Sequence, residues 1–186
     1  KVRERRQMLR DLPVAVLSLK DFPGAPEVEE DGSTFRDNAL KKAQEVSRHI
    51  SETVLADDSG LEVDSLEGQP GIHSARYAGP EATDGANNAK LLKTLEGVPK
   101  EKRGAGFRCV LALVSPDGSS EFFEGAWRGE ILFEPRGTMG FGYDPLFLDP
   151  DQGLTAAELP PELKNRISHR GRAFAKFREW LEKGGS

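Results

Sequence analysis

Hydrophobic positions along the chain recur with two different periods, and this alternation predicts a protein of mixed helices and strands. Residues 14–19 form a short apolar run rich in Val and Leu, which is typical of a strand. Residues 53–56 form a second run, which we expect Asp57 to Gly60 to break, with a possible further strand over residues 61–66. Strand order cannot be obtained from this pattern.

Two longer apolar segments predict a hairpin. Residues 107–115 and 120–133 flank Pro116-Asp117-Gly118, which is a turn signal. Cys109 lies inside the first of these segments, so we interpret it as a buried structural residue rather than a reactive one. A glycine-rich loop is expected over residues 135–145.

Helical periods separate these strands. Residues 2–12 and 84–96 are expected to be helical, with Gly97 ending the second helix. Thr34 and Ser168 are candidate caps for two further helices. The helix after Thr34 has an apolar stripe at 3.6-residue spacing, formed by Phe35, Ala39, Ala43, Val46 and Ile50.

Composition and charge narrow the class of protein. The 186 residues are 37% hydrophobic and 31% charged, which fits one globular domain over residues 1–186. The net charge of −5 argues against general binding to nucleic acid, which depends on neutralising phosphates. No apolar run approaches the length of a membrane span. With one cysteine, Cys109, no internal disulfide can form, and we expect a cytoplasmic protein.

The sequence Asp57-Asp58-Ser59-Gly60 is the sharpest candidate for chemistry. Two adjacent carboxylates at a strand end repel each other, so a cation such as Mg²⁺ would explain them. An Asx turn or a helix cap explains the same residues without a ligand, and the spacing alone leaves both interpretations open.

Acidic and basic residues near Thr34 extend this candidate site. Glu30 lies in the acidic loop just before the helix and could complete a metal site begun by Asp58, although acidic loops more often serve solubility. Asn38 and Lys42 are four residues apart and therefore share one helix face. Lys42 could reach a phosphate, but a solvated helix face is the commoner meaning of this spacing.

Two later segments could bind an aromatic, electron-rich ligand. Gly140 to Pro145 combines flexible backbone with Phe141, whose ring could stack on a base or simply fill the core. Ser168-His169-Arg170-Gly171 opens the last helix, with Lys164 just upstream. Cations at a helix N-terminus oppose the helix dipole, which favours a functional reason for them over a merely exposed start.

Taken in order, five motifs of this chain resemble the Ham1-type inosine triphosphate pyrophosphatases. The resemblance covers nearly the whole chain, and the order of the motifs makes it specific. The motifs are Thr34-Phe35…Asn38-Ala39…Lys42-Ala43, Leu55 to Asp64, Pro70-Gly71-Ile72 with Ser74 to Gly79, Gly140 to Pro145, and Ile167 to Gly171.

The resemblance implies a function and a fold. It implies Mg²⁺-dependent hydrolysis of ITP, dITP and XTP to the monophosphate and pyrophosphate, which cleanses the nucleotide pool, with Mn²⁺ as a possible substitute for Mg²⁺. The implied fold is α/β, an elongated mixed sheet with flanking helices in two lobes and the substrate cleft between them. It also implies a homodimer.

Roles follow from the resemblance residue by residue. Asp58 is similar to the general base and metal ligand of the family, and Glu30 to the second metal ligand. The remaining matched residues would contact substrate: Lys1, Asn38, Lys42, Ser59, Phe141, Gly142, Tyr143, Asp144, Lys164, His169 and Arg170.

The chain departs from the family at its start. Lys1 matches the last residue of a Thr-Gly-Asn-x-x-Lys loop that grips phosphates in the family. The preceding strand and the rest of that loop are missing ahead of Lys1, and we expect a gap in coverage rather than a natural loss.

Three rival readings remain open. A Maf-like nucleotide pyrophosphatase would run the same reaction on pyrimidine or modified nucleotides. A non-catalytic nucleotide- or RNA-binding module would use the basic C-terminal stretch. A metal-dependent phosphatase would release single phosphates instead of pyrophosphate.

Overall fold

The structure is a computed structural model that describes Met8 and residues 14–185. The predicted helix over residues 2–12 lies outside the described residues except for Met8. The helices are α2 (Phe35–Ile50), α3 (Asp84–Thr94), α4 (Pro161–Ile167) and α5 (His169–Glu182). The strands are β1 (Val54–Val63), β2 (Gly104–Val114), β3 (Ser120–Ile131), β4 (Phe147–Asp149) and β5 (Leu154–Thr155). Short 3-10 helices include Leu19–Asp21 and Gly71–Arg76.

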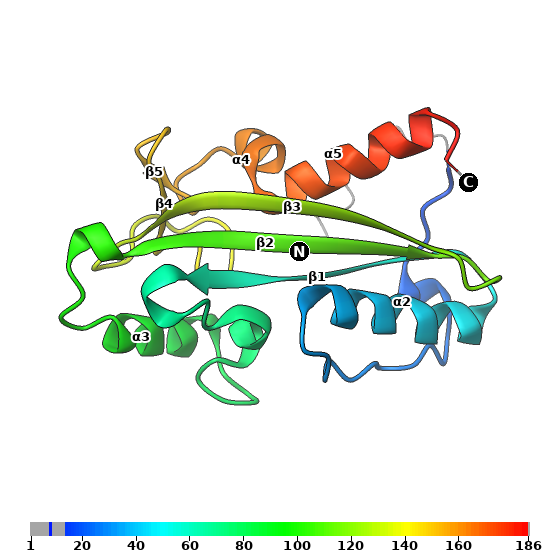
Figure 1. Ribbon diagram of the computed structural model, residues 1–186, viewed down its shortest axis with the longest axis horizontal. Helices are drawn as coiled ribbons and strands as arrows, with labels where there is room; N and C mark the ends of the chain where they lie inside the picture. The colour runs from blue at the N-terminus through cyan, green and yellow to red at the C-terminus, as the bar shows by residue number, and fades with distance from the viewer. Residues whose placement is uncertain (1–7, 9–13, 186) are drawn as a thin grey trace. The chain divides into compact units, whose positions relative to one another are not determined.

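One sheet contains the five strands in the order β1-β2-β3-β4-β5, and the predicted α/β class is confirmed. The arrows of β1 and β2 point in opposite directions in Figure 1. Strand β3 pairs antiparallel with β4, with Glu130 opposite Leu148, and β4 pairs antiparallel with β5. The strands β2 and β3 are the expected hairpin, and Gly118 donates its N–H to Ser115 in the connecting turn.

The chain folds into two compact units. Unit 1 comprises Lys1–Asp58, Cys109–Gly125 and Arg170–Ser186, and unit 2 comprises Ser59–Arg108 and Ala126–His169. The strands β1, β2 and β3 and the helix α5 therefore each have residues in both units.

Unit 1 is a sheet segment between two helices. In Figure 1, α2 covers one face of its strands and α5 covers the other. Its core includes Cys109, Leu111, Phe123, Phe174 and Phe177, all buried. Cys109 is thus a core residue, as predicted, and Phe123 meets Phe177 edge-on at 5.4 Å.

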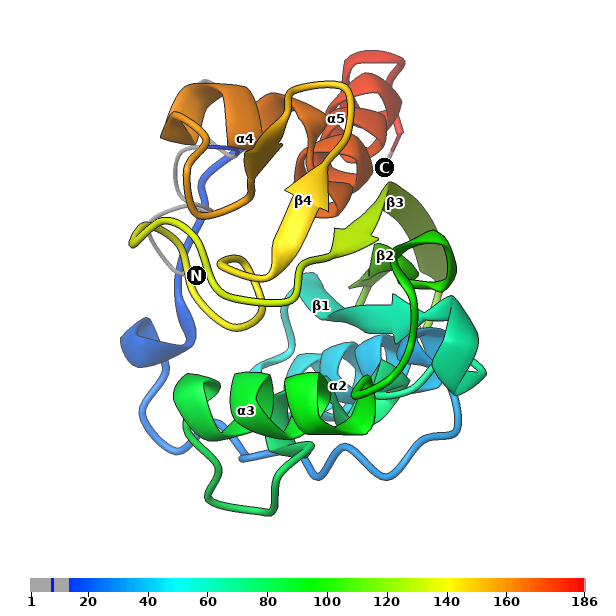
Figure 2. The ribbon, with the colours of Figure 1, turned by 90° about the vertical axis from the view of Figure 1, so that its left-hand side faces the viewer.

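Unit 2 has a core of its own. Figure 2 shows α3 below the sheet and α4 above it. Trp127, Phe107 and Phe147 form an aromatic group within this core, with ring centroids 4.5 Å apart for Phe107 and Phe147. Burying one such ring contributes about 1.5–3 kcal/mol, so these three are a large share of the stability of the unit.

The helices predicted after Thr34, over residues 84–96 and after Ser168 are confirmed, and two strand predictions are wrong. Thr34 caps α2 by accepting the N–H of Asp37, and α3 ends before Gly97. Residues 14–19 are not a strand: among the described residues no neighbouring strand pairs with them, and Val14 and Leu17 are exposed. A strand needs such a neighbour, because an unpaired edge gains no ladder hydrogen bonds.

The second wrong prediction concerns Asp57 to Gly60. These residues do not break the strand, since β1 runs through them from Val54 to Val63. Successive side chains of a strand point to opposite faces. Asp57 and Asp58 therefore do not face each other, and each finds its own partner.

Candidate functional site

Asn38 and Asp58 form the buried centre of a polar cluster in unit 1. Asn38 lies one turn into α2, where its exposed fraction is 0%, and Asp58 lies on β1 with 8% exposed. The Asn38 amide donates to Oδ2 of Asp58 at 3.0 Å. Its Oδ1 accepts the N–H of Gly32 at 2.8 Å. Asn38 therefore ties the loop before α2 to the strand.

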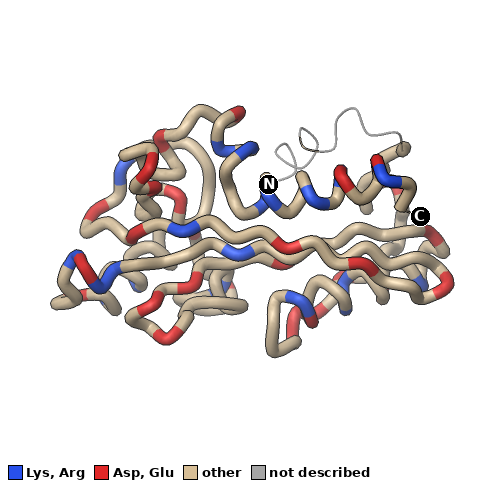
Figure 3. The backbone as a smooth tube through the Cα atoms, turned by 45° about the horizontal axis from the view of Figure 1, so that its top comes forward, with Lys and Arg blue, Asp and Glu red and all other residues tan. Residues whose placement is uncertain are grey.

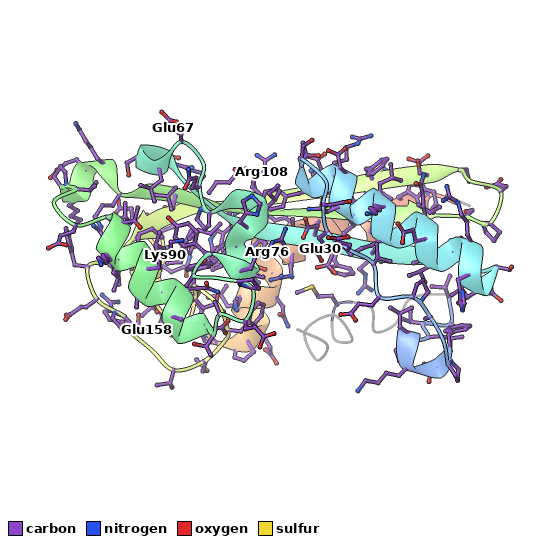
Figure 4. The ribbon with its side chains drawn as sticks, turned by 90° about the horizontal axis from the view of Figure 1, so that it is seen from below. Glu30, Glu67, Arg76, Lys90, Arg108 and Glu158 are labelled. Atoms are coloured by element: carbon purple, nitrogen blue, oxygen red, sulfur yellow. The ribbon has the colours of Figure 1, made fainter. Side chains whose placement is uncertain are left out.

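Lys42, one turn after Asn38, brings a positive charge to the same cluster. Its Nζ lies 2.9 Å from Oε1 of Glu30 and 3.6 Å from Oδ1 of Asp58. It also donates to the carbonyl oxygen of Asp57 at 2.7 Å. Glu30 lies in the extended segment ahead of α2 (Figure 4). One ammonium thus contacts both of the carboxylates that the sequence analysis singled out as metal ligands.

Asp57 faces the other side of β1. Its Oδ2 lies 3.8 Å from Nε of Arg170, at the start of the part of α5 that belongs to unit 1. Lys and Arg recur along α5 (Figure 3), and Arg170 is the one whose ion pair with Asp57 is buried. The sequence interpretation of Asp57 and Asp58 as one acidic pair around a cation is therefore wrong. The two residues belong to opposite faces, and only Asp58 joins Glu30.

Glu30 and Asp58 fit a divalent cation. Both side chains are carboxylates, and one oxygen of each contacts the same cation, the ammonium of Lys42. Mg²⁺ prefers oxygen ligands and is often held by one or two carboxylates together with phosphates of the substrate. Within the described residues, no group of three or more Asp, Glu, His or Cys side chains could hold a metal ion.

A second polar cluster lies in unit 2, around the carboxylate of Asp144. Its Oδ2 accepts the N–H of Phe141 at 2.8 Å and Nζ of Lys164 at 2.6 Å. Asp144 and Lys164 are both buried, and Lys164 lies 5.1 Å from the centroid of the half-buried Phe141 ring. The loop Gly140–Asp144 thus presents an aromatic ring beside a buried ion pair.

Tyr143 anchors this loop to the core of unit 2. Its hydroxyl donates to the carbonyl oxygen of Ser74 at 2.8 Å, and burial raises the pKa of Tyr143. The phenol therefore stays protonated and remains a donor at neutral pH. This contact belongs to the scaffold of the loop, because the ring of Tyr143 packs in the core of unit 2.

The peptide groups on either side of Gly142 are held by two residues that the sequence analysis missed. Asp84 accepts the N–H of Gly142 at 2.7 Å, and Asn88 donates to its carbonyl oxygen at 3.0 Å. Both residues come from α3. Their spacing of four was the available signal, because it places two polar side chains on one helix face.

His169 stacks in the aromatic core of unit 2. Its ring lies 4.7 Å from that of Phe107 with 15° between the planes, and 6.5 Å from that of Trp127. Trp127 in turn donates its indole N–H to Asp149 at 2.8 Å. Packing therefore fixes the orientation of the imidazole, and its position directly after α4 brings it into the same unit as Lys164.

The structure brings most of the predicted site residues into these two clusters. Lys1 lies outside the described residues, and Ser59 is a half-buried residue of β1, next to Asp58 in sequence. The cluster in unit 1 contains Glu30, Asn38, Lys42 and Asp58, whereas Arg170 pairs with Asp57 on the opposite face of β1. The cluster in unit 2 contains Phe141, Gly142, Tyr143, Asp144 and Lys164, with His169 in the adjoining core.

Comparison with known proteins gives a consistent family. The model described as the Ham1 family matches residues 1–180. A dITP/XTP pyrophosphatase of Geobacter sulfurreducens is 57% identical over 181 residues, covering 97% of this chain and 91% of the relative. One of Desulforamulus reducens is 53% identical over 183 residues, covering 98% and 91%.

Solved structures agree with the sequence comparison. A HAM1 protein from Coxiella burnetii superposes with a TM-score of 0.91 at 42% identity, covering 98% of this chain and 93% of that one. The Ham1 protein of Staphylococcus aureus gives 0.89 at 40% identity, with coverage of 98% and 93%. Among the residues that the structure describes, no helix is long and apolar enough to cross a membrane.

Proposed function

We propose, since the chain belongs to the Ham1 family, that it hydrolyses dITP, XTP and ITP to the monophosphate and pyrophosphate with the help of Mg²⁺. The observation that carries the proposal is the carboxylate of Asp58. One of its oxygens accepts from Asn38, and the other faces the ammonium of Lys42. An acidic group held in this way can orient a water molecule and take its proton.

The cluster in unit 1 would act on the phosphates. Glu30 and Asp58 would hold the divalent cation, which supplies positive charge against the phosphate oxygens. Mn²⁺ has the same preference for oxygen ligands and could replace Mg²⁺. Lys42 adds fixed positive charge to the same cluster. Phosphoryl and nucleotidyl transfer depend mainly on such positioning and electrostatics.

Asp58 would carry the proton transfer. A water oxygen attacks the α-phosphorus, its proton passes to Asp58, and the bond between the α-phosphorus and the bridging oxygen breaks. Pyrophosphate leaves with the electrons of that bond, and the nucleoside monophosphate keeps the new oxygen. Asn38 would keep the Asp58 carboxylate in one orientation throughout, because turning its amide over would break the hydrogen bonds to both Gly32 and Asp58.

The cluster in unit 2 would recognise the purine. Phe141 offers a ring face for stacking, a contact worth about 1–3 kcal/mol for one base. Hypoxanthine and xanthine carry an oxygen acceptor at position 6, where adenine carries an amino donor. A site that offers a donor there leaves that donor unpaired against adenine, at a cost of about 1–3 kcal/mol.

The donor for position 6 would be a side chain. The N–H groups of Phe141 and Gly142 are already bonded to Asp84 or Asp144, and that of Asp144 to the carbonyl of Phe141. We propose Lys164 and His169, two side chains of unit 2 that can donate hydrogen bonds, for this role.

Product analysis tests the proposed function. The purified chain is incubated with Mg²⁺ and, in turn, XTP, dITP, ITP, ATP and GTP, and the products are separated. Monophosphate and pyrophosphate from the first three, with ATP poor, are the expected result. Release of orthophosphate would instead identify a phosphatase, and preference for pyrimidine nucleotides would identify a Maf-like enzyme.

A variant at Asp58 links the activity to the site. Asp58→Asn should keep the fold and lose at least about two orders of magnitude in kcat, which is the usual contribution of a general base. A variant within tenfold of the parent would contradict the role given to Asp58. Gln44→Glu, a charge change on the same helix as Asn38, serves as the control and should keep full activity.

We also propose a cytoplasmic homodimer, which rests on the family resemblance. Light scattering on the eluate of a sizing column measures the mass directly. Twice the 20.4 kDa of the chain is expected.

A further inference from the structure

The peptide groups of Gly142 are clamped at both ends by helix α3. Oδ2 of Asp84 accepts its N–H at 2.7 Å, and Nδ2 of Asn88 donates to its carbonyl oxygen at 3.0 Å. Asp84 and Asn88 are one turn apart, so a single helix face supplies both contacts. The two positions have opposite requirements: residue 84 must accept a hydrogen bond and residue 88 must donate one.

We call Asp84 and Asn88 the clamp. They hold Gly142, which lies in the loop between the Phe141 ring and the buried carboxylate of Asp144. Gly142 has φ +61°, a left-handed conformation that residues with a side chain rarely adopt. It follows Phe141 and lies two residues before Asp144. A rotation of its peptide groups would therefore swing the Phe141 ring relative to the ion pair of Asp144 and Lys164.

We propose that Asp84 and Asn88 are positioning residues that set the purine specificity of the loop. By fixing Gly142, they hold the Phe141 ring over the place where the base stacks and keep the loop's own N–H groups away from it. The inference rests on the proposed function, because it concerns the base of the same substrate. Neither residue is required to touch the nucleotide.

Other contacts hold the loop in place, which separates the clamp from simple folding. Tyr143 bonds Ser74, and Asp144 bonds both Phe141 and Lys164. Asp84 is exposed and Asn88 is half-buried. Loss of the clamp should thus loosen Gly142 without unfolding unit 2.

The orientation of the Asn88 amide supports a specific hydrogen-bond role. Its Nδ2 faces the Gly142 carbonyl, while its Oδ1 is buried with no hydrogen-bond partner among the described residues. Turning the amide over would place two oxygens against each other. Position 88 therefore keeps a donor toward Gly142 even though this leaves an acceptor unsatisfied, which costs free energy.

A matched pair of isosteric variants tests the clamp. Asp84→Asn keeps an oxygen that can accept the Gly142 N–H, whereas Asn88→Asp replaces the donor with a carboxylate. Each changes the charge by one unit on the same helix face. Steady-state kinetics with XTP, dITP and ATP, and binding of IMP measured by calorimetry, give the readouts. Lys93→Ala on an exposed position of α3 is the control.

We expect Asn88→Asp to raise KM for XTP and weaken IMP binding about tenfold, the effect of one lost hydrogen bond plus oxygen–oxygen repulsion. Its kcat should stay within about twofold, its preference for XTP over ATP should fall, and its Tm should fall by no more than about 6 °C, because the lost hydrogen bond also stabilises the free protein. Lys93→Ala should match the parent, and Asp84→Asn, whose amide oxygen can still accept the Gly142 N–H, should change IMP binding much less than Asn88→Asp does. Asp84→Ala, which removes the acceptor, should behave as Asn88→Asp does and replaces it if that variant does not fold.

Several results would overturn the clamp. Equal behaviour of Asp84→Asn and Asn88→Asp would do so, as would a fall in kcat for every nucleotide with KM and the XTP preference unchanged. A parent protein that binds IMP but does not hydrolyse XTP would contradict the proposed function alone, and IMP binding by the variants would still decide on the clamp. A parent that neither binds IMP nor hydrolyses XTP would contradict both.

Discussion

Asn38 donates its side-chain amide to the carboxylate of Asp58 at 3.0 Å, across twenty residues of sequence. The contact joins a helix to a strand, and both residues are buried. The same amide accepts from Gly32, so its orientation is fixed from both sides. The other oxygen of Asp58, Oδ1, faces the ammonium of Lys42.

Asn38→Asp should shift the pH dependence of the activity upward. It places a second carboxylate 3.0 Å from Asp58, and two acids this close cannot both ionise easily. The second carboxylate raises the pKa of one member of the pair, so kcat/KM should fall on the acidic side of the profile and recover as the pH rises. The profile of kcat/KM between pH 6 and 10 checks this.

Gln44→Glu adds the same charge to α2, at a position away from this contact, and should leave the profile unchanged. A variant Asn38→Asp with the parent's profile would show that the Asn38 contact does not control Asp58.

Lys42→Met should make the protein less stable without metal and more responsive to it. Lys42 supplies the positive charge that Glu30 and Asp58 share, and both side chains keep some exposure. Its loss should cost about 1 kcal/mol, the upper range for partly exposed pairs, or about 2–4 °C in Tm for a chain of this length. Added Mg²⁺ should then raise Tm by more than it does in the parent.

Lys41→Met is the matched control for this prediction. Lys41 is the next residue on the same helix and lies 2.6 Å from Asp31, away from the candidate metal ligands. An equal Mg²⁺-induced rise in Tm for Lys41→Met, Lys42→Met and the parent would contradict the shared-cation interpretation.

The sequence was sufficient for α2 but not for its partner on β1. The amphipathic stripe after Thr34 predicts the helix, and the spacing of Asn38 and Lys42 predicts that they share a face. Nothing local shows that Asp57 and Asp58 lie inside a strand and face opposite ways. The strand forms because these residues pair with β2, which is distant in the sequence. Only this pairing places Asp57 beside Arg170 and Asp58 beside Asn38.

Lys164→Met should destabilise unit 2 strongly. Lys164 and Asp144 form an ion pair at 2.6 Å with side chains 9% and 4% exposed. Removing one partner leaves a buried charge uncompensated, at a cost of about 3–5 kcal/mol. The double variant Lys164→Met with Asp144→Asn should recover part of this loss, because it removes both charges. Urea unfolding of the four proteins gives the coupling free energy.

Lys183→Met tests an exposed ion pair whose charged atoms are as close as those of Lys164 and Asp144. Lys183 and Glu179 also lie 2.6 Å apart, but their side chains are 72% and 63% exposed. That pair should contribute much less to stability, because water and salt screen the attraction between exposed charges. Similar losses for Lys164→Met and Lys183→Met would show that burial does not set the strength of the Asp144 pair.

The base loop shows a similar limit of sequence reasoning. Glycines and an aromatic residue identify Gly140–Asp144 as a candidate binding loop, and the structure places Phe141 beside Lys164 as expected of such a loop. Asp84 and Asn88 lie more than fifty residues earlier, in a helix whose sequence alone indicates an ordinary solvent-exposed face. Their role appears only when the fold brings that helix against Gly142.

Glu158→Gln should lower stability above about pH 4.5 and have no effect near pH 2. The Arg136 guanidinium, together with the N–H of Thr155, lowers the pKa of Glu158 from 4.5 to about 2. The folded state therefore favours the ionised carboxylate. Its contribution to stability is complete above the unfolded pKa and is lost as the pH falls through the folded pKa.

The measurement is the difference in Tm between the parent and Glu158→Gln at several pH values from 6 down to 2.5. The difference in Tm should be constant down to about pH 4.5 and then shrink. Below that pH, protonation of Glu158 in the parent removes the negative charge that Gln lacks at every pH. Glu134→Gln, an exposed position outside this contact, should show no such dependence. A Tm difference that persists unchanged to pH 2.5 would mean that Glu158 acts by packing and not through its charge on Arg136.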